Sequence, residues 1–189
     1  MTDQSPIPAV LPMSAPADYY DMSRVRPEVA AAMAKINELG PVFASRAKAV
    51  DDDASFPTDN YRDLADAGFL GLSIPQEFGG WGFSMGEYAM VGAEIAKYCG
   101  ATALTFNMHN SSMAWSRFMY DMPNLSAEEK AAFAPLRAKQ FTRAMKERAI
   151  YSQPISEGGQ NWTSKPNQTQ ARAVEGGWKI SGFKKFASL

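Results

Sequence analysis

The chain has 189 residues, of which 46% are hydrophobic and 21% are charged, and its formal net charge is −1. This composition is that of a globular protein, and the charge excludes the basic surface that attracts nucleic acids or anionic membranes. The lone cysteine, Cys99, excludes an internal disulfide and fits a reducing compartment. The sequence holds neither a bilayer-spanning apolar run nor a targeting-peptide pattern. We therefore expect a cytoplasmic protein without a nucleic-acid or membrane partner.

The first part of the chain predicts an arm followed by helices. Residues 1–24 are rich in proline and small residues, which predicts an irregular arm. A helical pattern starts at Pro27, and Gly40-Pro41 predicts a break before a second piece that ends near Asp51–Asp53. The apolar residues of the first piece share one face: Val29, Met33, Ile36 and Leu39.

Start and stop signals predict the helices that follow. A helix over residues 58–67 is closed by Gly68, a usual residue just past a helix end. Ser84–Glu87 and Ser126–Glu129 both have the S-x-x-E form of a capping box and predict two helix starts. Residues 101–120, rich in Met, Phe, Thr and Ala, predict a buried helix between them.

The last forty residues predict strands. We expect strands at Ile150–Gln153 and Thr169–Val174, then a turn at Glu175–Gly177 and a strand from Trp178, which with Ile180 would be half-buried. Helices followed by strands favour separate units over an alternating fold. We expect an α+β protein: an all-α domain over 25–147, then the first strands of an incomplete antiparallel β-domain over 148–189.

Several possible sites favour plain structural roles. The spacing of Gly79–Gly82 differs from that of a nucleotide phosphate loop and indicates a turn with positive φ. Asp51–Asp53 is typical of a solvated helix end, and no ligand cluster indicates a metal. His109, the only histidine, has no nucleophile-base pattern around it. Cys99 is expected to pack as a small hydrophobe.

Four segments in order resemble the acyl-CoA dehydrogenase family. Gly71–Ser84 (GLSIPQEFGGWGFS) is similar to its G-L-x-x-P-E-E-Y-G-G-x-G-x-S signature, and Thr102–Ser111 looks like the helix that lines its acyl pocket. Ile155–Gly159 (ISEGG) resembles its flavin loop, V/L-T/S-E-P-G, and Ser181–Ser188 (SGFKKFAS) is similar to its N-G-x-K-x-W-I-T. Together, in order and at plausible separations, these motifs extend the resemblance over nearly all of the chain after about residue 25.

The resemblance implies a bound FAD. It implies that the backbone of Ile155 and Ser156 holds the pyrimidine edge of the flavin and that the Ser156 hydroxyl bonds the ring near its reactive nitrogen. Phe186 matches the aromatic that packs on the ring, and Ser188 the hydroxyl residue beside it. From the residues alone, Phe186 also reads as an ordinary core aromatic and Ser156 as a loop hydroxyl bonded to its own backbone.

The resemblance also implies an acyl-CoA substrate, with Thr105 and Met108 lining the fatty-acyl channel. Gly158 stands where the family usually has proline, and Asn161-Trp162-Thr163 replaces its G-S-D. Because Trp162 is far bulkier than the serine that contacts CoA, we expect it to disturb a standard CoA pose, and a different thioester or a non-CoA substrate stays open as an alternative.

The family's C-terminal helical domain carries the catalytic glutamate and would lie beyond Leu189. We therefore assign no catalytic residue in this chain, and we expect it to be inactive alone and to bind FAD weakly. The resemblance implies a homo-oligomer at full length and an electron-transfer partner. Two alternatives stay open: a flavin monooxygenase that shares the fold, and a non-catalytic partner of a full-length subunit.

Overall fold

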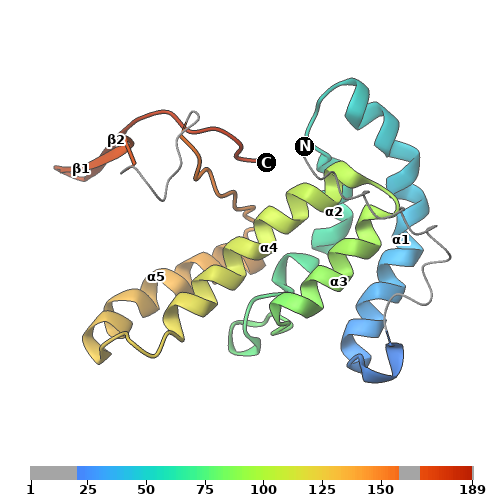
Figure 1. Ribbon diagram of the computed structural model, residues 1–189, viewed down its shortest axis with the longest axis horizontal. Coiled ribbons are helices and arrows are strands. Elements are labelled where there is room, and N and C mark those ends of the chain that lie inside the picture. Colours follow the sequence, from blue (N-terminus) through green and yellow to red (C-terminus); the bar gives the residue numbers. More distant parts are fainter. Residues whose placement is uncertain (1–20, 158–166, 189) are drawn as a thin grey trace, which may run out of the picture.

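The computed structural model describes residues 21–157 and 167–188. These residues form a mostly helical body followed by a small antiparallel sheet (Figure 1). This is the α+β arrangement that the order of sequence signals predicts. The main helices are α1 (Pro27–Asp52), α2 (Thr58–Asp66), α3 (Met85–Ala96), α4 (Gly100–Tyr120) and α5 (Ala127–Lys146). The short 3₁₀ helices are η2 (Met22–Arg24), η3 (Phe69–Gly71) and η4 (Gln76–Phe78), and the strands are β1 (Gln170–Val174) and β2 (Gly177–Ser181).

The predicted break at Gly40-Pro41 is wrong, because α1 runs through both residues without interruption. Proline removes one backbone hydrogen bond from a helix, but contacts with the segment after α3 hold α1 together at this point. The ring of Tyr98 packs against Gly40, where a larger side chain would collide with it. The Tyr98 hydroxyl also donates a 2.8 Å hydrogen bond to Asn37 Oδ1, one turn before the proline.

The other helix boundaries agree with the sequence signals. Both capping boxes form: the side chains of Ser84 and Ser126 each accept a hydrogen bond from the backbone amide three residues later, and the carboxylates of Glu87 and Glu129 accept one from the backbone amides of these serines. α2 is followed by Gly68, whose φ of 80° is in the left-handed region. Local chemistry at the helix ends is therefore sufficient to set these boundaries.

The main core lies where α1, α3 and α4 pack together. Its buried side chains include Ile36 and Phe43 of α1, Val91 and Ile95 of α3, and Phe106 of α4. A smaller cluster joins α4 to α5 and contains Ile74, Met113, Phe141 and Ala144. Only one face of α4 is buried, however, since the large apolar side chains Leu104, Trp115, Phe118 and Met119 are exposed.

The strands β1 and β2 form a hairpin that lies apart from the helical body (Figure 1). Gly176 takes the positive φ of 78° that the turn requires. The prediction that Trp178 and Ile180 are half-buried is wrong: they are 69% and 71% exposed, because no other described element covers either face of the hairpin. β2 also ends at Ser181 and does not continue to Ser188.

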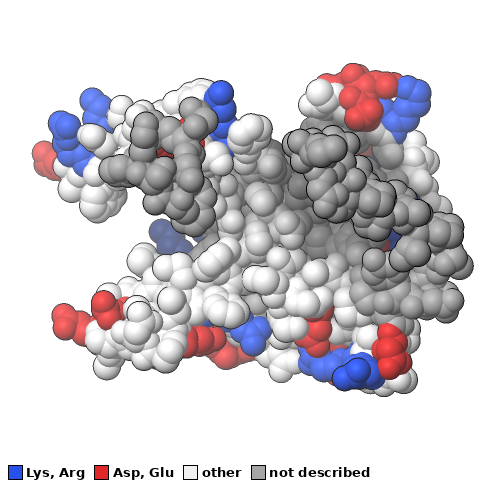
Figure 2. Space-filling view, viewed as in Figure 1, with Lys and Arg blue, Asp and Glu red and all other residues white. Residues whose placement is uncertain are grey.

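The strand predicted at Ile150–Gln153 does not form. The described helices also include none with the length and apolar character that crossing a bilayer requires. In the view of Figure 2, charged side chains gather along the edges of the molecule, and the middle of the face is largely uncharged.

Candidate functional site

The two residues expected to line an acyl channel lie on α4. Thr105 and Met108 are three residues apart, so they are neighbours on one helix face, and both are half-buried. The Thr105 hydroxyl donates to the carbonyl oxygens of Ala101 and Thr102 at 3.0 and 3.1 Å. The Thr105 hydroxyl proton is therefore hydrogen-bonded within the helix. Thr105 contributes the shape of its side chain to this face.

The residues expected to contact a flavin come together from two segments. The amide of Lys185 donates a 2.8 Å hydrogen bond to the carbonyl oxygen of Ser156, in an isolated antiparallel bridge. This bridge puts Ile155 and Ser156 beside the segment that contains Phe186 and Ser188. The pairing could not be read from either motif alone, because 29 residues separate the bridged pair in sequence.

Phe186 is a surface aromatic in this structure. Its ring is 79% exposed, so the alternative of a core aromatic is wrong for the described residues. Both Phe186 and Ser188 have positive φ, at 58° and 55°. This conformation is uncommon for residues other than glycine, and such residues are often found at functional sites.

Sequence reasoning missed Glu157, which organises the same loop. Its carboxylate lies 2.6 Å from Lys184 Nζ and accepts a 3.0 Å hydrogen bond from the amide of Thr169 and another from that of Gln168. Lys184 also donates to the carbonyl oxygen of Ile155 at 3.1 Å. Glu157 is buried, and its hydrogen bonds, that from Lys184 foremost, lower its pKa to about 2. An acidic residue inside the S-E-G-G loop was the only available signal.

His109 is the second residue that sequence reasoning undervalued. It is fully buried on α4, and its Nε2 lies 2.9 Å from the carbonyl oxygen of Leu70. The amide of Tyr151 donates to its Nδ1 at 3.2 Å. These contacts give His109 a connecting role that its lone position in the sequence did not indicate.

The remaining candidates have the structural roles expected of them. Gly79 and Gly82 have φ of 84° and 68°, which is the turn predicted for Gly79–Gly82. Asp51–Asp53 is exposed at the end of α1. Cys99 is buried just before α4, where its sulfur accepts a hydrogen bond from Thr102 Oγ1 at 3.1 Å. Trp162, expected at the substrate site, lies outside the described residues.

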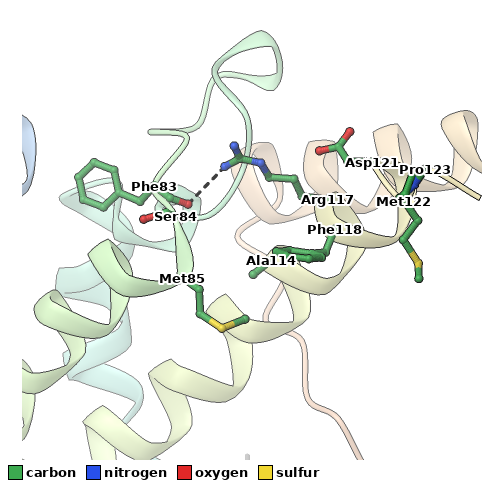
Figure 3. A pocket seen from close by; sticks show the side chains of 9 residues that line it. All are labelled: Phe83, Ser84, Met85, Ala114, Arg117, Phe118, Asp121, Met122 and Pro123. Atoms are coloured by element: carbon green, nitrogen blue, oxygen red, sulfur yellow. Dashed lines mark hydrogen bonds between the residues drawn. The ribbon is translucent and has the colours of Figure 1, made fainter.

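An apolar pocket of about 430 Å³ lies elsewhere, between the start of α3 and the end of α4. Figure 3 shows Met85 and Phe118 on its walls and Arg117 donating to the carbonyl oxygen of Phe83, at 3.3 Å. The Arg117 guanidinium is thus hydrogen-bonded to the backbone before α3, and its side chain forms part of the pocket wall. The pocket is lined by Phe83, Ser84, Met85, Ala114, Arg117, Phe118, Asp121, Met122 and Pro123, so it contains neither Thr105 nor Met108.

The described residues thus form a helical domain followed by a β-hairpin, with one bridge between the Ser156 loop and the segment after β2. Residues 38–121 match the family model for the acyl-CoA dehydrogenase N-terminal domain. By this match the chain contains an acyl-CoA dehydrogenase N-terminal domain over those residues.

Two of the curated relatives match over most of this chain. Benzylmalonyl-CoA dehydrogenase of Aromatoleum aromaticum is 26% identical over 142 residues, which is 75% of this chain and 35% of that protein. The human protein named short-chain specific acyl-CoA dehydrogenase, mitochondrial, is 29% identical over 150 residues, which is 78% of this chain and 32% of that protein. The chain thus spans about a third of the length of these relatives.

Two solved structures share the fold. Nitrososynthase from Micromonospora carbonacea var. africana has a TM-score of 0.65 at 20% identity, covering 84% of this chain and 38% of that one. Methanesulfinate monooxygenase from Pseudomonas fluorescens has a TM-score of 0.57 at 23% identity, covering 84% and 35%. At these identities the likeness establishes the fold of the described chain.

Proposed function

We propose that this chain forms the N-terminal part of an FAD-dependent oxidoreductase that dehydrogenates an acyl-CoA thioester between its α and β carbons. The match to the acyl-CoA dehydrogenase N-terminal domain and the curated relatives support the oxidoreductase class. The observation that carries the proposal is the bridge between Ser156 and Lys185, which joins the two motifs that the resemblance assigns to the flavin.

The exposed groups at this bridge suit a planar cofactor. Ile155 and Phe186 present exposed apolar side chains, and Ser156 is exposed as well. An aromatic ring with a free face can stack on another ring system. When bound, FAD would accept the hydride that leaves the β-carbon of the substrate.

We assign the following roles to the chain's own residues. The backbone of Ile155 and Ser156 holds the pyrimidine edge of the flavin, and the Ser156 hydroxyl donates a hydrogen bond near its reactive nitrogen. Such donors stabilise negative charge that develops on the ring. Phe186 packs on the ring, with Ser188 beside it.

The substrate is proposed to lie along α4. Thr105 and Met108 line the acyl channel by their shape, and Trp162, which lies outside the described residues, is proposed to change the recognition of the thioester's carrier group. We assign no general base for the α-proton within the described residues. His109 is unsuitable, because both of its ring nitrogens face backbone groups and it is fully buried.

We further propose the organisation that the sequence predicts: an arm over 1–24, a helical domain over 25–147 and a β-domain that begins at 148. Relatives of which this chain matches only 35% and 32% support a larger protein. We propose that this larger protein is a homo-oligomer that passes electrons to a separate acceptor.

The proposal is tested by mixing the flavin-loaded full-length protein, of which this chain forms the N-terminal part, with acyl-CoAs of several chain lengths without oxygen. Loss of the flavin's visible absorption with at least one of them is the expected result. Full retention of that absorption with every chain length would reject acyl-CoA dehydrogenation.

A flavin monooxygenase is the second candidate, because both reported structures of this fold carry the names of enzymes from outside the dehydrogenases, one of them a monooxygenase. The same experiment separates the two candidates. A monooxygenase would keep its oxidised flavin with acyl-CoA and would consume oxygen only after a separate reductant is supplied.

A further inference from the structure

His109 connects three separate segments of the chain. It lies on α4, its Nε2 faces the carbonyl oxygen of Leu70, and its Nδ1 faces the amide of Tyr151. A carbonyl group only accepts hydrogen bonds and a backbone amide N–H only donates them. The two partners therefore specify a neutral imidazole with its proton on Nε2. Burial, the larger influence, lowers the pKa of His109, while the bond to Leu70 acts in the opposite direction.

Tyr151 is held at both its backbone and its side chain. Besides the amide bond to His109, its hydroxyl lies 3.5 Å from the carbonyl oxygen of Gln140 on α5, and its ring centre is 6.3 Å from that of His109. Ile155 follows four residues later and so lies within about 14 Å of Tyr151 by chain length alone. The loop that contains Ile155 and Ser156 thus starts from a point fixed on the helical body.

We infer that His109 is a positioning residue that fixes the segment Tyr151–Ser156 against α4. Thr105, expected at the substrate channel, is one helical turn from His109 on the same helix. A single buried side chain then sets the separation between the substrate helix and the flavin loop. The consequence for flavin rests on the proposed function, but the anchoring contact does not depend on a cofactor.

Two conservative substitutions separate the two hydrogen bonds of His109. In His109→Asn, the amide oxygen can occupy the place of Nδ1 and accept from Tyr151. In His109→Gln, the longer amide can donate to Leu70 from the place of Nε2 and leaves the Tyr151 amide without its acceptor. The readout is hydrogen exchange of the Tyr151 amide, measured by NMR in the 189-residue chain.

In His109→Gln we expect this amide to exchange about tenfold faster than in the wild type, the effect of losing one buried hydrogen bond. The resonances of Ile155 and Ser156 should shift in the same variant. In His109→Asn both properties should return toward wild type. Equal exchange in the two variants, or faster exchange in His109→Asn, would overturn the inference.

A second measurement links the anchor to the cofactor. With FAD bound, the visible spectrum and reduction potential of the flavin should change in His109→Gln and recover in His109→Asn. An unchanged flavin in His109→Gln would overturn the effect on the loop. Complete lack of FAD binding by the wild type would instead reject the proposed function, and the exchange comparison would still decide the role of His109.

Discussion

The ammonium group of Lys184 lies 2.6 Å from the carboxylate of Glu157, across 27 residues of sequence. The same ammonium group donates to the carbonyl oxygen of Ile155, and the same carboxylate accepts from the amides of Gln168 and Thr169. This ion pair, whose Lys184 side chain is partly exposed, thus joins the loop after Tyr151, the start of β1 and the segment after β2. The shape of the proposed flavin loop depends on it.

Replacing Glu157 with glutamine should loosen this junction. The substitution removes the charge that strengthens the hydrogen bonds from Lys184 and the two amides. We expect amide exchange at Thr169 to rise about tenfold, measured by NMR. Glu175→Gln is the matched control, because Glu175 is exposed in the hairpin turn, and it should leave this exchange unchanged. Equal effects of the two substitutions would contradict the role given to Glu157.

The ion pair also predicts a dependence on pH. The folded pKa of Glu157 is lowered from 4.5 to about 2, chiefly by the hydrogen bond from Lys184. A lowered carboxyl pKa means that the stabilisation is complete above about pH 4.5 and is lost as the pH falls through about 2. The carboxyl carbon shift of Glu157 should therefore titrate near 2. A midpoint near 4.5 would show that the pair does not form.

Two helical glycines should respond in opposite directions to alanine. Gly40→Ala would force a methyl group into the Tyr98 ring and should destabilise the fold by about 1–3 kcal/mol. In Gly92→Ala the new methyl group meets nothing within 4 Å, so the better helix propensity of alanine should stabilise by up to about 1 kcal/mol. Urea denaturation measures both. If Gly40→Ala left the free energy of unfolding unchanged, the packing of Tyr98 against Gly40 would not explain why α1 continues through Pro41.

The capping box of α5 offers a test of local stability. Ser126→Ala removes the hydroxyl that accepts from the Glu129 amide at 3.2 Å, and we expect a loss of about 1 kcal/mol in the free energy of unfolding. Ser45→Ala serves as the control, since Ser45 is exposed within α1 and bonds only to the helix carbonyl of Val42 in the described contacts. It should be neutral or slightly stabilising.

The sequence predicted features that depend on neighbouring residues. The helices that begin after Ser84 and Ser126 have both cap partners within three residues, so a short motif contains the whole interaction. The turn at Gly176 is equally local. Spacing rules for such elements need no knowledge of the rest of the fold.

The predictions that failed depend on distant contacts. At Gly40-Pro41 the helix persists through contacts with Tyr98, which a rule about proline alone does not include. Ile150–Gln153 has the residue types of a strand, yet the amide of Tyr151 bonds to a side chain on α4. The connecting role of His109 could not be predicted either, because its two hydrogen-bond partners, Leu70 and Tyr151, lie about forty residues before and after it in the sequence.

The candidate flavin residues were available from motif order, but their pairing was not. The sequence indicates Ser156 and Phe186 separately, and only the fold brings their segments into one bridge. The positive φ of Phe186 was unpredictable for a physical reason: aromatic residues seldom adopt it without support from surrounding structure.

The central claim is that FAD binds where the Ser156 loop meets the Phe186 segment, and an NMR titration of the chain with FAD tests it most directly. Such a titration detects weak binding as well as tight binding. We predict that amide shifts concentrate at Ile155, Ser156, Phe186 and Ser188, and that Phe186→Ala weakens them. Shifts that instead concentrate at the pocket between α3 and α4, or no shifts at saturating FAD, would contradict the account.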